Sequence, residues 1–202
     1  MRPDGADLTN SAARAIPNTG ASRRLAPSHA APRDRRTNIP SMARIDAPDA
    51  GLGPHIDWMM HRVHMATGVG ALSEAVYGNT QLTFREREAA RWIVAQLNAC
   101  RVCQAAETAD GEAHRTDEAF YTAVLDWRES AELTERERLA AEFAERFVRD
   151  HQAMDDEFWA RLRTGFADDE IADLVICCGT FLGLGRMLAV LDVDPPDAGL
   201  TV

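Results

Sequence analysis

The sequence predicts an all-α fold, and three observations support this prediction. Apolar side chains recur at helical spacing through most of the chain after residue 41, and no alternating strand pattern of useful length appears. Two segments, starting at Leu82 and Leu133, share the pattern L-T-x-R-E-R-x-A-A. Each has a threonine followed three residues later by a glutamate, which is the capping-box signature of a helix start. We therefore expect a helical domain built from two duplicated units.

The domain is expected to span residues 42–202, behind a tail. Residues 1–41 mix prolines, glycines and arginines without an apolar period, which predicts a disordered segment. Pro54 suits the first turn of a helix that continues to about residue 63, and a short helix is expected over 71–77. Further helices are expected from Thr83, Thr116, Thr134 and Asp168 and over 154–163, with Gly111 in a loop.

The charge and the cysteine content narrow the classes of function. The chain has 202 residues and a net charge of −10, which argues against general nucleic-acid binding because phosphates need a basic face. We find no run of eighteen or more apolar residues and no apolar signal segment, so we expect no membrane span and a cytoplasmic location. Four cysteines in such a chain indicate thiols rather than a disulfide framework.

The strongest candidate for chemistry is the single Cys-x-x-Cys pair, Cys100 and Cys103. Asn98 can cap a new helix, which would place both cysteines in its first turns. Free N–H groups and the helix dipole at such a position favour the thiolate, which attacks peroxides and disulfides. A zinc site is an alternative, but it needs about four ligands and no second pair accompanies this one. Inert thiols are the other alternative.

A carboxylate in the first copy of the repeat is the second candidate. Glu88 occupies the position that Leu139 occupies in the second copy, so it projects where a core leucine would lie if the two units pack alike. Burying a carboxylate without a partner is costly, and ionisable groups placed in this way cluster at functional sites.

The spacing of Glu88, Cys100 and Cys103, with Asn98 just ahead of the pair, resembles the alkylhydroperoxidase D-like branch of the carboxymuconolactone decarboxylase superfamily. The resemblance extends over roughly residues 42–193. It implies a cofactor-free peroxidase in which Cys103 is the peroxidatic cysteine, Cys100 resolves it and Glu88 relays protons. It also implies a dithiol reductant as partner and a homo-oligomer, either a trimer or a hexamer.

The sequence departs from this family at one position. The family places a histidine four residues after the second cysteine, where this chain has Glu107. A carboxylate there can still carry a proton, but an ionised one disfavours the nearby thiolate. Thiol–disulfide exchange is therefore an alternative to peroxide reduction. Further alternatives are a lyase or lactone-processing enzyme that uses Glu88 and Glu107 as acid and base, and a non-catalytic assembly protein.

The remaining cysteines and histidines are interpreted as structural. Cys177 and Cys178 lie in the most apolar predicted helix and are expected in the core, because buried free cysteine acts as a small hydrophobe. The group His55, His61 and His64 has no third-ligand pattern for a metal and is expected at the surface or partly packed.

Overall fold

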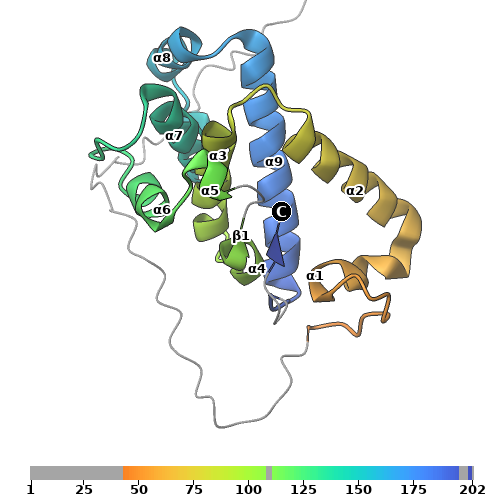
Figure 1. The fold of residues 1–202 in the computed structure, drawn as a ribbon. Coiled ribbons are helices and arrows are strands. Elements are labelled where there is room, and N and C mark those ends of the chain that lie inside the picture. Colours follow the sequence, from red (N-terminus) through yellow and green to blue (C-terminus); the bar gives the residue numbers. More distant parts are fainter. Residues whose placement is uncertain (1–42, 108–110, 196–199, 202) are drawn as a thin grey trace, which may run out of the picture.

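The computed structural model describes residues 43–107, 111–195 and 200–201, so the predicted tail lies outside the described residues. Helices make up most of the described part, which confirms the all-α prediction (Figure 1). In chain order the elements are α1 (Pro54–Asp57), the 3-10 helix η1 (Trp58–Arg62), α2 (Val63–Gly78), α3 (Phe84–Leu97), α4 (Arg101–Ala105), β1 (Ala106–Glu107), α5 (Gly111–His114), α6 (Glu118–Leu125), α7 (Glu135–Arg149), the 3-10 helix η2 (His151–Ala153), α8 (Asp156–Gly165), α9 (Asp168–Val190) and β2 (Leu200–Thr201).

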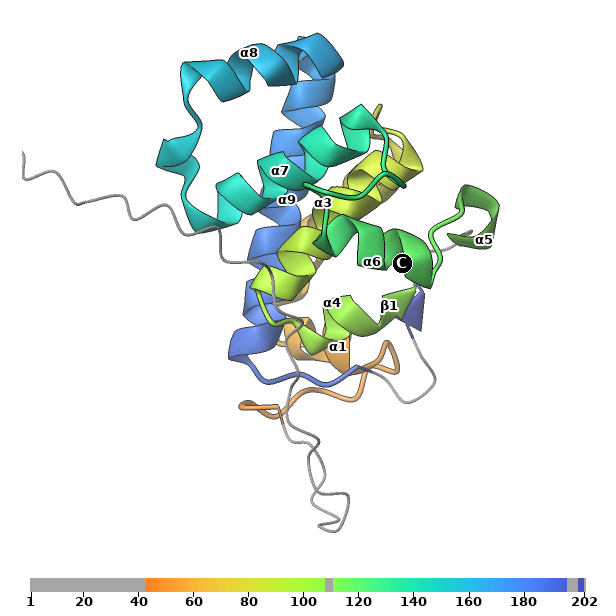
Figure 2. The ribbon, with the colours of Figure 1, turned by 90° about the vertical axis from the view of Figure 1, so that its left-hand side faces the viewer.

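The core lies where α3, α7 and α9 pack together. Ile93 of α3, Phe143 of α7 and Leu174 of α9 are all buried in one apolar cluster. Burying a side chain of this size contributes about 1.5–3 kcal/mol relative to leaving it exposed. The small residues Ala89 and Ala140, both fully buried, occupy matching positions of the repeat. Figure 2 shows α3 and α7 side by side, with α9 packed behind them.

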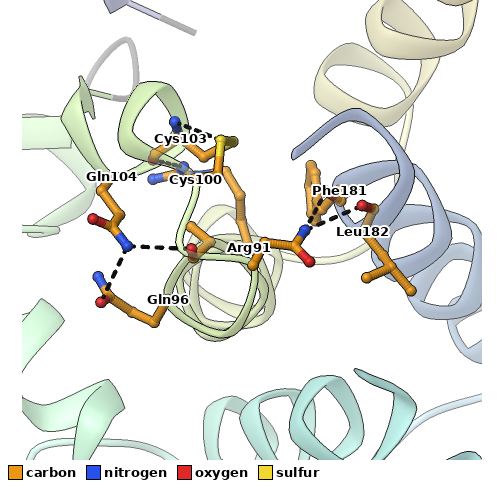
Figure 3. The surroundings of a disulfide bond; sticks show 9 residues. Arg91, Gln96, Cys100, Cys103, Gln104, Phe181 and Leu182 are labelled. Atoms are coloured by element: carbon orange, nitrogen blue, oxygen red, sulfur yellow. Dashed lines mark hydrogen bonds between the residues drawn. A yellow bond between two sulfur atoms is a disulfide. The ribbon is translucent and has the colours of Figure 1, made fainter. Parts of the chain in front are cut away.

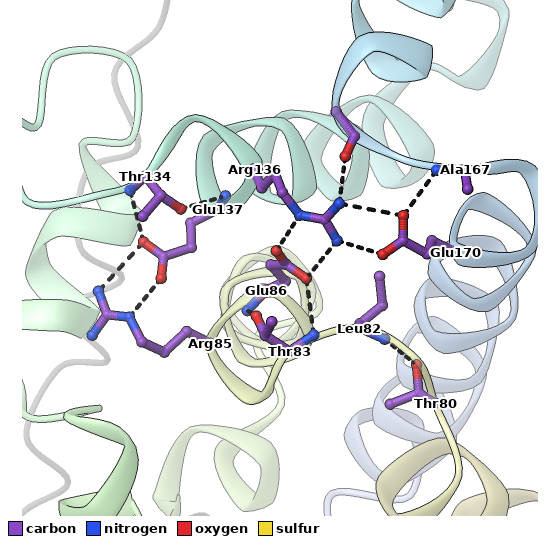
Figure 4. A network of polar contacts seen from close by, with 11 residues as sticks. Thr80, Leu82, Thr83, Arg85, Glu86, Thr134, Arg136, Glu137, Ala167 and Glu170 are labelled. Atoms are coloured by element: carbon purple, nitrogen blue, oxygen red, sulfur yellow. Dashed lines mark hydrogen bonds and ion pairs between the residues drawn. The ribbon is translucent and has the colours of Figure 1, made fainter.

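The repeated sequence forms two matching helix starts. Thr83 caps α3 and Thr134 caps α7, and the capping box predicted from the sequence is complete at both. Arg85 of the first copy donates from Nε to Glu137 of the second copy at 2.5 Å. Arg136 of the second copy donates from Nε to Glu86 of the first copy, also at 2.5 Å (Figure 4).

This reciprocal pairing relates the two copies to each other. Each capping-box glutamate binds the backbone of its own helix start and the arginine of the other helix, so one set of residues both starts the helices and docks them. Arg136 also reaches Glu170 of α9 at 2.7 Å, which extends the network to the third core helix. The predicted duplication is therefore expressed as a repeated structural contact.

Three predicted helix starts were displaced. The cap before the cysteine pair is Cys100, not Asn98, because Ala99 adopts a left-handed conformation with φ 49°. The amides of Ala99 and Cys100 then bond back to the carbonyls of Gln96 and Ala95, as in a Schellman motif.

The other two displacements are by one residue. Asp117 rather than Thr116 caps α6, since its carboxylate accepts from the Phe120 amide. Ala167 rather than Asp168 precedes α9, and Glu170 supplies the side-chain bond to its amide.

Four further features differ from the sequence prediction. The short helix expected over 71–77 is part of the longer α2, and Gly111 begins α5 instead of lying in a loop. A two-residue parallel pair joins β1 to β2. In the described part, α9 is long and apolar enough to cross a membrane by length and composition. The sequence led us to expect no membrane span, because it has no uninterrupted apolar run of that length. A core helix passes the same test, and one side of α9 packs in the core.

Candidate active site

The two cysteines of the candidate site form a disulfide at the start of α4. Cys100 and Cys103 are joined, with their Cα atoms 5.2 Å apart. Cys100 is the N-cap and is fully buried, and its Sγ accepts a hydrogen bond from the Cys103 amide at 3.2 Å. Cys103 is only half-buried. The two sulfurs therefore differ in access, although they lie in the same turn (Figure 3).

The last helix packs closely against this turn through a glycine. A Cβ atom added at Gly185 of α9 would lie 3.2 Å from the Cys103 Sγ and 2.9 Å from the Asn98 side-chain nitrogen. Asn98 donates from that nitrogen to the Leu182 carbonyl at 3.1 Å, which fastens the end of α3 to α9. Only glycine leaves room here for both the disulfide and the amide.

Glu88 is fully buried, as its alignment with Leu139 predicted, and it has partners. Arg91 donates to it from Nη2 at 2.6 Å and from Nε at 2.8 Å, and the Tyr121 hydroxyl donates at 2.8 Å. Burial alone would lower the pKa of Arg91, but the hydrogen bonds and charge of Glu88 raise it above its ordinary value. Arg91 therefore stays charged inside the protein.

Arg91 connects this ion pair to the cysteine turn. Its Nη1 donates to the Cys103 carbonyl at 2.7 Å. The contacts of the Glu88 carboxylate run to Arg91 and Tyr121, so in this geometry Glu88 acts on the disulfide turn through Arg91. The sequence analysis missed both partners. The three-residue spacing of Glu88 and Arg91 on one helix face is the signal that could have revealed the first of them.

A cavity of about 640 Å³ lies against Cys103. Residues from α1, η1, α2, α3, α4 and α9 line it, and most of them are apolar. Its apolar lining includes Ile56, Trp58, Met59, Met60, Phe181 and Leu184. Its polar lining includes His55, Ser73, Glu74, Tyr77 and Arg91. Cys103 lines the cavity and Cys100 does not, so a small organic molecule held there would meet the sulfur of Cys103 first.

The fourth predicted site residue is placed only by its backbone. Glu107 lies in β1 and pairs with Thr201 of β2, while its side chain lies outside the described part of the structure. Its predicted role next to Cys103 therefore stays a prediction.

The other two cysteines are buried in α9, as expected from its apolar sequence. Burial raises the pKa of Cys177 to about 11 and raises that of Cys178 well above its ordinary value. Thiols of this kind are poor nucleophiles near neutral pH. Among the described residues, no group of three or more His, Cys, Asp or Glu side chains is arranged to hold a metal.

Comparison with known proteins identifies the fold. A scan against protein-family models and a search of curated proteins both found no match. A peroxidase-related protein from Silicibacter aligns with a TM-score of 0.67 at 21% identity, covering 81% of this chain and 96% of its own. An alkylhydroperoxidase AhpD core protein from Ralstonia eutropha aligns with a TM-score of 0.66 at 20% identity, covering 78% of this chain and 94% of its own.

A third structure with this fold is the debrominase Bmp8 in complex with 2,3,4-tribromopyrrole. It aligns with a TM-score of 0.61 at 19% identity and covers 73% of this chain and 80% of its own. The chain therefore has the alkylhydroperoxidase D-like fold, as its sequence predicted. Identities near 20% establish this fold and leave the activity to be argued from the site.

Proposed function

We propose that the protein is a cysteine-based oxidoreductase that reduces organic hydroperoxides, with Cys103 as the attacking thiolate and Cys100 as the resolving thiol. The single observation that supports it best is the unequal access of the two sulfurs. Cys103 lines the cavity, whereas Cys100 is fully buried within the same turn. A substrate can therefore reach one sulfur, and the other is held ready to form the disulfide.

The reaction balances with these two thiols alone. The Cys103 thiolate attacks the outer oxygen of ROOH, so that an S–O bond forms, the O–O bond breaks and the alkoxide leaves and is protonated to ROH. The Cys100 thiol then attacks the Cys103 sulfenic acid, which forms the disulfide and releases water. A dithiol reductant, the partner implied by the family resemblance, must return two electrons to complete the cycle.

The lining of the cavity favours an organic substrate. Aromatic, aliphatic and methionine side chains stabilise an apolar group by removing its surface from water, whereas hydrogen peroxide has no such surface. We propose that the reaction takes place in the cytoplasm, as expected from the sequence, and in a homo-oligomer, a trimer or a hexamer, as the family resemblance implies. In this proposal Glu88 positions the cysteine turn through Arg91, and its proton relay stays a prediction.

The test compares two oxidants in a single turnover. Fully reduced protein is mixed with cumene hydroperoxide or with hydrogen peroxide, and disulfide formation is followed by quenching and mass analysis. We expect faster oxidation by cumene hydroperoxide and sustained turnover when a dithiol such as dihydrolipoamide is added. Equal, slow oxidation by both compounds, at the rate of a free cysteine, contradicts the proposal.

A second candidate is reductive dehalogenation of an apolar ring. The apolar cavity beside Cys103 and the fold shared with a debrominase favour it. Two thiols would supply the electrons, converting Ar–Br and two RSH into Ar–H, bromide, a proton and a disulfide. Release of bromide from tribromopyrrole by the reduced protein, lost in Cys103→Ser, would support this candidate. Disulfide formation with hydroperoxide and no bromide release excludes it.

A further inference from the structure

The departure at residue 107 leaves the cysteine turn without the histidine that the family resemblance implies. The cavity nevertheless contains an imidazole, and it comes from a different part of the chain. His55 of α1 and Cys103 of α4 line the same 640 Å³ cavity. From the sequence His55 is expected at the surface or partly packed, because nothing in the sequence connects residue 55 to residue 103.

The packing of the segment around His55 holds this residue in the wall of the cavity. Trp58 donates from Nε1 to the His55 carbonyl at 3.1 Å, and the Trp58 ring packs against the buried cluster of Cys100, Val102 and Val193. Figure 1 and Figure 2 both show α1 and α4 at the same end of the molecule, near the C-terminal end of α9. His55 therefore belongs to the wall of the cavity and not to a loose surface segment.

The ring of His55 has one blocked edge. Its Nδ1 is buried without a hydrogen-bond partner, and a Cβ atom at Gly53 would lie 3.1 Å from Cε1 and 3.2 Å from Nδ1. Gly53 has a φ of 92°, a conformation that favours glycine, so the chain is shaped to let the ring lie against it. A proton on Nδ1 would be a buried donor with no acceptor beside it, so we place the proton on the other ring nitrogen, Nε2.

Burial favours the neutral form of this imidazole. Burial lowers the pKa of His55, and Asp57 on the same segment opposes that effect only in part. The other ionisable groups that face the cavity are Glu74 and Tyr77 of α2, Arg91 of α3 and Cys103. Arg91 is already bound to Glu88. A neutral imidazole with its proton on Nε2 is a hydrogen-bond donor that stays in place as a substrate gains negative charge.

We propose that His55 is a catalytic residue of this site, which donates an Nε2–H hydrogen bond to the leaving oxygen of a hydroperoxide attacked by Cys103. The inference rests on the proposed function. As the O–O bond breaks, the leaving oxygen takes the electron pair as an alkoxide, His55 stabilises the developing charge and keeps its proton, and water supplies the proton of the alcohol. In this proposal His55, from the N-terminal segment of the domain, supplies the imidazole that residue 107 does not.

The test uses three variants of the full chain. His55→Leu removes the donor, His55→Gln replaces it with an amide N–H, and His64→Leu is the matched control because His64 is exposed and does not line the cavity. For each reduced protein, two rates at Cys103 are measured: disulfide formation with cumene hydroperoxide and alkylation by iodoacetamide. Alkylation needs the thiolate but no donor to a leaving oxygen.

We expect His55→Leu to lose about 10²-fold in the peroxide rate, the effect of removing one oxyanion donor, and to keep its alkylation rate. His55→Gln should recover part of the loss, and His64→Leu should match the wild type. The wild-type peroxide rate per thiolate should rise as the pH falls through the pKa of His55, because the imidazolium is the stronger acid, and this rise should vanish in His55→Leu.

Two results overturn the inference alone. They are an unchanged peroxide rate in His55→Leu, and an equal fall in both rates, which would show a structural role. If wild-type protein forms no disulfide with cumene hydroperoxide, the proposed function fails and the inference fails with it.

Discussion

The two copies of the repeated helix share their helix-start contacts and differ in their chemically reactive residues. Both α3 and α7 begin with the same capping box, and each helix binds the capping glutamate of the other through a matching arginine. Two residues after the capping glutamate, α3 carries Glu88 and α7 carries Leu139, and both side chains are buried. Only α3 continues into the turn that holds the disulfide. The contacts that both copies share therefore hold the fold, while the residues that differ in the first copy form the candidate site.

The largest expected effect is on the asymmetric half. Cys103→Ser should abolish disulfide formation with cumene hydroperoxide, because it removes the sulfur that lines the cavity. Cys177→Ser, which alters a buried thiol of α9, should keep most of the rate. Single-turnover oxidation measures both variants. Loss of activity in Cys177→Ser with the fold intact would contradict the assignment of Cys103 as the reactive thiol.

Making the first copy resemble the second should destabilise the protein. Glu88→Leu leaves the Arg91 guanidinium buried without its carboxylate, which we expect to cost about 3–5 kcal/mol of unfolding free energy. The double variant Glu88→Leu/Arg91→Met removes both charges and should recover much of that loss without restoring activity. Urea unfolding monitored by circular dichroism gives these values. A cost below about 1 kcal/mol for the single variant would show that the ion pair is not buried as described.

The two tightly packed glycines offer a second comparison. A Cβ atom at Gly185 would press on the Cys103 Sγ, whereas one at Gly165 would lie 2.8 Å from Leu139 Cδ1 in the second copy. Both alanine variants should lose about 1–3 kcal/mol of stability through overpacking. Only Gly185→Ala should also change the alkylation rate of Cys103. Equal alkylation rates of Cys103 in the two variants would show that Gly185 does not influence the candidate site.

The smallest expected effect is on the stability that the shared helix-start contacts contribute. Burial alone would raise the pKa of Glu137, but the hydrogen bonds from Arg85 and Thr134 and the charge of Arg85 lower it below its ordinary value. The stability that this pair contributes is therefore present above the unfolded pKa and is lost as the pH falls through the lower, folded pKa.

The measurement is unfolding free energy against pH for the wild type and for Arg85→Ala. The variant should lose about 1 kcal/mol near neutral pH and less in acid, with the peroxide rate unchanged. A variant that loses the same stability at every pH would contradict the assigned role of Arg85.

The sequence predicted the structural features that depend on residues close together in the chain or on the repeat. The caps at Thr83 and Thr134 and the pairing of Cys100 with Cys103 follow from short spacings, and the burial of Glu88 follows from its alignment with Leu139 in the second copy. It failed at Asn98, because the left-handed conformation of Ala99 moves the cap to Cys100. The place of His55 in the cavity wall could not be predicted, because the cavity forms where residues of α1, α2, α4 and α9, far apart in the chain, come together.

The most direct test of the account is to map all four cysteines after oxidation. Fully reduced protein is treated with one equivalent of cumene hydroperoxide, its intact mass is measured, and peptides identify the modified residues. The account predicts a rapid loss of two hydrogens at Cys100 and Cys103, with Cys177 and Cys178 still thiols. A pair that stays reduced while Cys103 alkylates no faster than a free cysteine would contradict it.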